Sequence, residues 1–119
     1  MTRVRPSETP APDGLETLAD ADVPAFLEGA RVCLLAFLDK DDAAFRARLD
    51  VLAASLARPG FRAGAVDLDR HRLVADAMGV QRAPCVVVFV DGEAVDRLLG
   101  APPDAVLRDV VEQRVRASG

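Results

Sequence analysis

The sequence predicts an α/β domain in which a central mixed β-sheet is flanked by helices on both faces. Two segments, Val32–Leu38 and Cys85–Val90, are continuous apolar runs of strand length, typical of strands buried on both faces. Strand-like and helix-like segments alternate through the first part of the chain, which favours parallel strands joined by helices. Asp91-Gly92 then predicts a tight hairpin turn, which adds an antiparallel pair.

The first half of the chain contains three strands and two helices in this interpretation. Residues 15–18 are predicted as a short edge strand, and a helix then begins at Asp20 or Asp22 and ends at Gly29. The run 32–38 is expected in the middle of the sheet. The next helix opens at residues 39–42, and Pro59-Gly60 stops it before a strand at 61–68. Its apolar residues recur on one face at helical spacing: Phe45, Leu49, Leu52 and Leu56.

The second half is predicted as a short helix, a β-hairpin and a final helix. Gly79 closes the short helix, and residues 80–83 form a loop before the hairpin strands at 85–90 and 93–99. Pro102-Pro103-Asp104 starts the last helix, where Asp104 suits the positive end of the helix dipole. The predicted apolar positions are Leu73, Val74, Ala77 and Met78 in the short helix, and Val106, Leu107, Val110, Val111 and Val115 in the last one.

Length and charge narrow the range of partners. The 119 residues suit one domain, expected at 15–119, and the Pro-rich residues 1–14 are expected to form a disordered tail rather than a signal peptide. The net charge of −4 argues against nucleic acid or an anionic membrane as the main partner, because both require a basic face. No apolar run approaches the roughly 20 residues that span a bilayer, so a cytoplasmic location is expected.

Four short segments resemble the thioredoxin family over roughly residues 15–116. Met78–Cys85 is similar to the family segment that contains a cis proline, so the Ala83–Pro84 bond is expected to be cis. Val88–Glu93 resembles a family strand and turn. Asp67-Leu68-Asp69 fits the family's Asn/Asp-x-Asp motif, and Leu99-Gly100-Ala101 resembles its Val-Gly-Ala. The resemblance implies a thioredoxin-like fold. It breaks at residues 37–45, where the family has its Cys-x-x-Cys motif and this chain has no cysteine.

The two cysteines do not replace that motif. Thiol–disulfide exchange needs a thiolate attacker and a resolving thiol. By the resemblance, Cys33 and Cys85 lie at staggered positions on adjacent antiparallel strands, beyond the ~7 Å Cα separation that a disulfide allows. Neither they nor His71 show metal-ligand spacing, and His71 has no adjacent acidic residue, so no metal and no cofactor are expected. Cys85 alone follows the expected cis proline, and as a lone cysteine it is either a core residue or a single reactive thiol.

The resemblance implies a peptide-binding groove in place of the redox site. Its residues here are Leu38, Asp39 and Lys40 on one side, and Gln81, Arg82, Ala83 and Pro84 on the other. An extended segment of a protein partner is expected to add main-chain hydrogen bonds there. Asp39, Asp41 and Asp42 either cap the helix or form an acidic contact site, and the basic residues 70–72 are either solvated or contact a partner.

The sequence thus favours a redox-inactive, thioredoxin-like protein-binding module over an enzyme. The expected role is that of an accessory or assembly chaperone for a larger enzyme, similar to cysteine-free accessory proteins of bacterial hydrogenase expression, although no motif is specific to them. One alternative is a single-cysteine thiol oxidoreductase or peroxidase that uses Cys85. Another is a structural subunit of a complex, marked by a large exposed apolar patch. Burial of Cys85 favours the module, whereas an accessible thiol of depressed pKa favours the enzyme.

Overall fold

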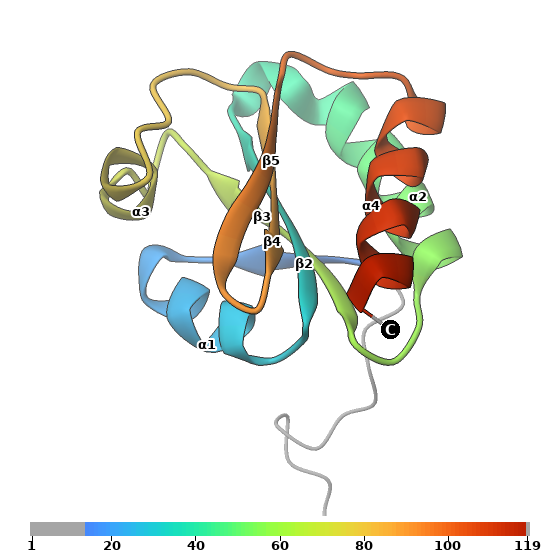
Figure 1. Ribbon diagram of the computed structural model, residues 1–119. Coiled ribbons are helices and arrows are strands. Elements are labelled where there is room, and N and C mark those ends of the chain that lie inside the picture. Colours follow the sequence, from blue (N-terminus) through green and yellow to red (C-terminus); the bar gives the residue numbers. More distant parts are fainter. Residues whose placement is uncertain (1–13, 119) are drawn as a thin grey trace, which may run out of the picture.

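A computed structural model describes residues 14–118 as a five-stranded sheet between two layers of helices (Figure 1). The predicted tail, apart from Gly14, lies outside the described residues. The strands are β1 (Leu15–Leu18), β2 (Val32–Leu38), β3 (Phe61–Asp67), β4 (Cys85–Val90) and β5 (Glu93–Leu99). The helices are α1 (Val23–Glu28), α2 (Ala43–Leu56), α3 (Leu73–Ala77) and α4 (Asp104–Ser118), with short 3₁₀ turns η2 (Asp20–Asp22) before α1 and η3 (Lys40–Asp42) before α2.

The strand order is β1-β3-β2-β4-β5, which places β2 in the centre and β1 at an edge, as predicted. β1 and β2 pair parallel with β3, whereas β4 pairs antiparallel with both β2 and β5, so the sheet is mixed. Asp91 and Gly92 adopt the left-handed backbone conformation, with φ of 53° and 84°, which confirms the predicted hairpin turn. The sequence did not predict the register shift between Val88 and Phe89.

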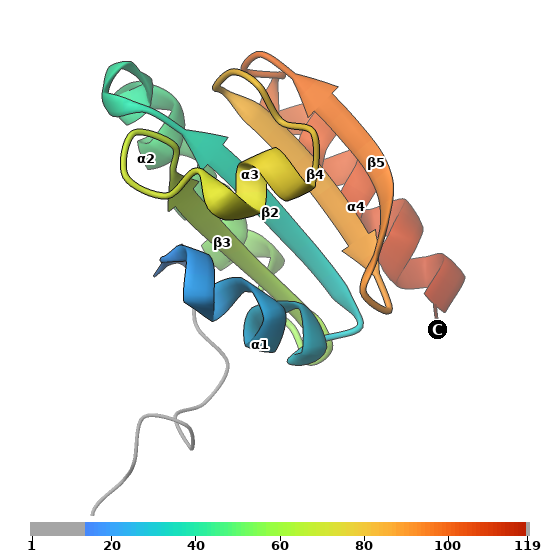
Figure 2. The ribbon, with the colours of Figure 1, turned by 90° about the vertical axis from the view of Figure 1, so that its left-hand side faces the viewer.

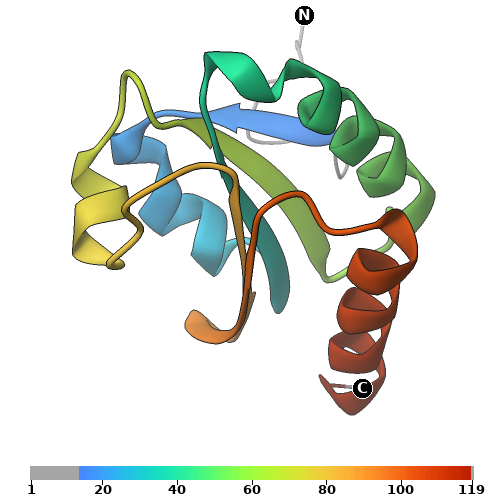
Figure 3. The same cartoon turned by 90° about the horizontal axis from the view of Figure 1, so that it is seen from above.

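Helices cover both faces of the sheet, as predicted. The helices α2 and α4 lie on one face and α1 and α3 on the other (Figure 2 and Figure 3). Each face has its own buried cluster: Leu34, Phe45 and Leu107 belong to the first, and Phe26 and Phe37 to the second. Because successive side chains of a strand point to opposite faces, the continuous apolar run of β2 supplies both clusters. Within residues 14–118, no helix is long and apolar enough to cross a membrane.

The predicted apolar faces of the helices are right for α2 and partly wrong for α3 and α4. All four predicted core residues of α2 are buried. In α3 the buried residue is Ala75, and the predicted Val74 and Met78 pack half-buried against the same cluster. Leu73 is 75% exposed, because only one side of a helix can face the sheet. In α4, Leu107 and Val111 are buried, but Val106 is 42% exposed. A helix of 3.6 residues per turn can bring only part of that broad apolar stripe against the sheet.

Candidate functional site

The two sides of the predicted groove meet at one end of the sheet, at the top of Figure 1. Because β2 and β4 are antiparallel and Phe37 pairs with Cys85, the chain leaving β2 lies next to the chain entering β4. The Ala83–Pro84 peptide bond is cis. The carbonyl of Pro84 accepts a hydrogen bond of 3.0 Å from the N–H of Gly100, which brings the connection after β5 to the same place.

Carboxylates occupy the backbone donors at the start of α2. The side chain of Asp39 accepts from the N–H of Asp41 at 2.8 Å, and the side chain of Asp42 accepts from the N–H of Asp39 at 2.9 Å. The N–H of Lys40 donates to Asp69 Oδ2 at 3.1 Å, and that of Asp42 to the Asp39 carbonyl. Four consecutive N–H groups are therefore satisfied, which supports the capping interpretation of these aspartates.

The neighbouring groups at the start of α2 shift the pKa of Asp42. Partial burial raises the pKa of the Asp42 carboxyl, the Asp39 N–H bond opposes the shift, and the charge of Asp39 reinforces it. A helix start of this kind carries its own negative charges. It offers no free donors between Asp39 and Asp42 to stabilise a thiolate.

The structure corrects the assignment of Leu38 to the groove surface. Its side chain is 2% exposed and packs in the cluster beneath α2 and α4. Its carbonyl accepts a hydrogen bond of 2.7 Å from the N–H of Leu68. Leu38 therefore supports the loop from beneath, because it is the last residue of the central strand and is covered on its side of the sheet. On this side of the groove, Lys40 is exposed and Asp39 is half-buried.

The other side of the groove presents unpaired backbone. Gln81 and Arg82 are exposed, and Ala83 and Pro84 are half-buried. Among residues 14–118, the backbone N–H and C=O groups of Gln81, Arg82 and Ala83 have no hydrogen-bond partner. Solvent-facing backbone of this kind can pair with an extended chain from another protein.

Both thiols are buried and free. Cys85 is 0% exposed, and burial raises the pKa of its thiol while the positive charge of Arg97 lowers it to a lesser degree. Burial also raises the pKa of Cys33, to about 11. Cys33 pairs with Phe89 and Cys85 with Phe37, a stagger of four residues that corresponds to ~13 Å along the strands. This stagger agrees with the predicted separation and is too great for a disulfide.

The structure gives His71 an acidic neighbour that the sequence did not reveal. Asp20 Oδ2 lies 3.7 Å from His71 Nδ1, too far for a hydrogen bond, and the other carboxylate oxygen accepts from the N–H of Val74. Asp20 lies 51 residues before His71, so neighbouring residues could not predict the contact. In the described part of the chain, no three His, Cys, Asp or Glu side chains converge as metal ligands.

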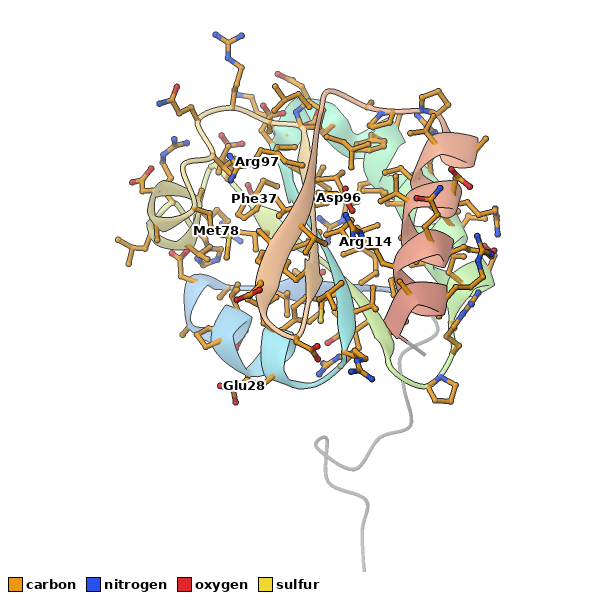
Figure 4. The ribbon with its side chains drawn as sticks, viewed as in Figure 1. Glu28, Phe37, Met78, Asp96, Arg97 and Arg114 are labelled. Carbon is orange, nitrogen blue, oxygen red and sulfur yellow. The ribbon has the colours of Figure 1, made fainter. Side chains whose placement is uncertain are left out.

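A pocket of about 380 Å³ adjoins the loop before β4. Arg97 of β5 reaches across it, and its guanidinium donates to the carbonyls of Met78 at 2.6 Å and Gly79 at 3.3 Å (Figure 4). Arg97 and Leu99 were not predicted at the site, because they reach it from the neighbouring strand. The alternation of β5 was the available signal, since it places both residues on one face of the sheet. The lining residues are Gly79, Val80, Gln81, Arg82, Cys85, Arg97 and Leu99.

This architecture is the thioredoxin fold. A mutant thioredoxin from Halobacterium salinarum NRC-1 superposes with a TM-score of 0.77 at 24% identity, covering 89% of this chain and 95% of that one. Fasciola hepatica thioredoxin gives 0.73 at 24% identity, with 84% and 99% covered.

One sequence relative extends the same likeness. The thioredoxin-like protein 1 of Schizosaccharomyces pombe is 35% identical over 68 residues, or 57% of this chain. The match spans 23% of the length of that relative. No family model matches the chain.

Proposed function

We propose that this chain is a redox-inactive, thioredoxin-like protein-binding module that holds an extended segment of a protein partner. The observation that carries the proposal is the unpaired backbone of Gln81–Ala83 beside a proline loop at the end of the sheet. An extended segment lying there gains main-chain hydrogen bonds, and the side chains of Lys40 and Arg82 flank it. Leu38 contributes only from beneath.

The environment of the thiols supports a role without redox chemistry. Exchange begins with a thiolate, and the burial that raises the pKa of Cys85 keeps the proton on its sulfur. The start of α2, where a redox pair would stand, holds carboxylates and no cysteine. A single-thiol enzyme that uses Cys85 would require the strand to open first.

The exposed apolar side chains give the structural-subunit alternative little support. In residues 14–118, the large exposed hydrophobic side chains are spread over α2, α3, β5 and α4 rather than confined to one element. Scattered residues of this kind are normal on a protein surface. The residues are Val51, Leu73, Val95, Leu99 and Val106.

The wider role proposed is that of an accessory or assembly chaperone for a larger enzyme in the bacterial cytoplasm. The support is the retention of the fold without the paired cysteines, as in the cysteine-free accessory proteins of hydrogenase expression. A module that keeps the groove but lacks the thiols can still hold a partner segment, and it cannot form a mixed disulfide with it through that loop.

Two measurements test this function. The reduced protein is expected to reduce insulin disulfides no faster than background, both as wild type and as Cys85→Ser. Turnover comparable to a thioredoxin control would contradict the redox-inactive role. Peptides selected from a random library are expected to shift the backbone amide resonances of Gln81–Ala83 and Lys40, and shifts confined to α4 would place binding elsewhere.

A further inference from the structure

The pocket beside the groove has a positive wall and an apolar floor. Arg82 and Arg97 are its charged lining residues, and no acidic residue among residues 14–118 lines it. Val80 and Cys85 are buried beneath it, and Leu99 stands exposed at its edge. Its volume of about 380 Å³ lies within the range of about 300–1,000 Å³ that is usual for ligand pockets.

The two arginines differ in how they are held. Arg97 is fixed by the carbonyls of Met78 and Gly79, and of its five N–H donors several remain for another acceptor. Arg82 has no hydrogen bond or ion pair to any residue between 14 and 118. Both guanidiniums line the same pocket, and each has N–H donors left over, so the pocket is suited to a carboxylate.

We propose that this pocket, the Arg82–Arg97 pocket, receives the side-chain carboxylate of an Asp or Glu within the bound partner segment. The inference rests on the proposed function, because the segment must lie along Gln81–Ala83 for its side chains to reach the pocket. In an extended chain alternate side chains share a face, so one of them points towards β5 while the backbone pairs with the loop.

An internal acidic residue fits better than a terminal carboxylate. The unpaired backbone flanks the pocket over three residues, so a bound segment continues past it rather than ending in it. Across the groove, the carboxylates of Asp39 and Asp41 lie at the start of α2. These two carboxylates outnumber the single positive charge of Lys40 on that side, which disfavours acidic residues there and leaves the preference for acid to the side that faces Arg97.

The test begins with peptides selected on the wild-type protein. Random peptides of about eight residues are long enough, at ~3.3 Å per residue, to run past the groove in both directions. Selection is expected to enrich Asp or Glu at one fixed position. The selected peptide and its amide analogue, with Gln or Asn at that position, then serve as probes in fluorescence anisotropy. We expect the acidic peptide to bind at least about tenfold more tightly than the analogue.

Two variants assign the acidic preference to the pocket. Arg97→Gln and Arg82→Gln are each expected to weaken binding of the acidic peptide about tenfold. The affinity for the amide analogue is expected to stay within about twofold of its wild-type value. Arg97→Gln also removes the hydrogen bonds to Met78 and Gly79, so the thermal stability of this variant must be measured alongside its binding. Arg82→Gln breaks no contact with the described residues and therefore tests the pocket without a risk to folding.

The matched control removes an equal charge far from the pocket. Arg116, in the last turn of α4, has a 69% exposed side chain whose ion pair is a 3.8 Å contact with Glu112. Arg116→Gln is expected to leave binding unchanged. Arg114 is unsuitable, because its guanidinium donates to both carboxylate oxygens of Asp96, at 2.7 and 3.1 Å, and so ties α4 to β5 (Figure 4).

The possible outcomes separate this inference from the proposed function. Peptides that shift the Gln81–Ala83 amides without preferring acid would overturn the pocket and leave the groove intact. An acidic preference that survives both Arg82→Gln and Arg97→Gln would also overturn the pocket. If no peptide binds, both proposals fail.

Discussion

Replacing Cys85 with Ser tests whether this thiol is part of the core or part of a reaction. The residue is 0% exposed, packs in the cluster that contains Phe37 and Val87, and its Sγ has no hydrogen-bond partner in the described structure. A hydroxyl at this position loses its bound water and gains no acceptor. The expected loss in the free energy of unfolding is about 1–3 kcal/mol.

Cys33→Ser is the matched control within the same cluster. Cys33 is equally buried, at 1% exposed, but its thiol lies 3.6 Å from the carbonyls of both Phe26 and Ala30. A serine hydroxyl there can donate to one of these carbonyls after a small shift. The loss in the free energy of unfolding is therefore expected to stay below about 1 kcal/mol. The same Cys-to-Ser change thus has a different cost at the two positions because the surroundings of the side chain differ.

Equilibrium unfolding in urea measures both variants, with the slope of the transition checked against wild type. For a domain of this size, each kcal/mol corresponds to a shift in Tm of about 4 °C. If Cys85→Ser is as stable as wild type, or loses less than Cys33→Ser, then Cys85 does not lie in an apolar environment. That result would refute the buried-thiol argument and favour the single-thiol enzyme.

Two further substitutions test packing and charge. Gly64→Ala is expected to destabilise the fold by about 1–3 kcal/mol in thermal unfolding, because the new Cβ would lie 2.5 Å from Leu18 Cδ1 and 3.1 Å from the ring of Phe26; an unchanged Tm would contradict this packing. Asp42→Asn is expected to be at least as stable as wild type at pH 7. The raised pKa of Asp42 means that the folded state binds this proton more tightly than the unfolded state does. The wild type therefore loses stability as the pH rises above ~4. Asn keeps an acceptor for the N–H of Asp39, and Tm measured against pH should show the difference vanish below about pH 3. A difference that grows towards low pH would show that the sign is wrong.

The sequence alone determined the order of the elements and the class of fold. The run from Val32 to Leu38 is apolar at every position, as expected for a strand buried on both faces. The spacing of Phe45, Leu49, Leu52 and Leu56 fits one face of a helix. These are local patterns, set by the periods of strand and helix. The absence of cysteine between residues 37 and 45 is likewise a property of the sequence.

Only the tertiary structure decided which side chains face the candidate site. Leu38, expected in the groove, is buried because the end of the central strand is covered by α2 and α4. Arg97, not expected there, reaches the pocket because β5 pairs beside β4. Asp69 and Asp20 meet Lys40 and His71 from distant parts of the chain. Periodicity predicts which face of its own strand or helix a residue lies on. The residues that surround it depend on strand order and register, and these are set by contacts between residues far apart in the sequence.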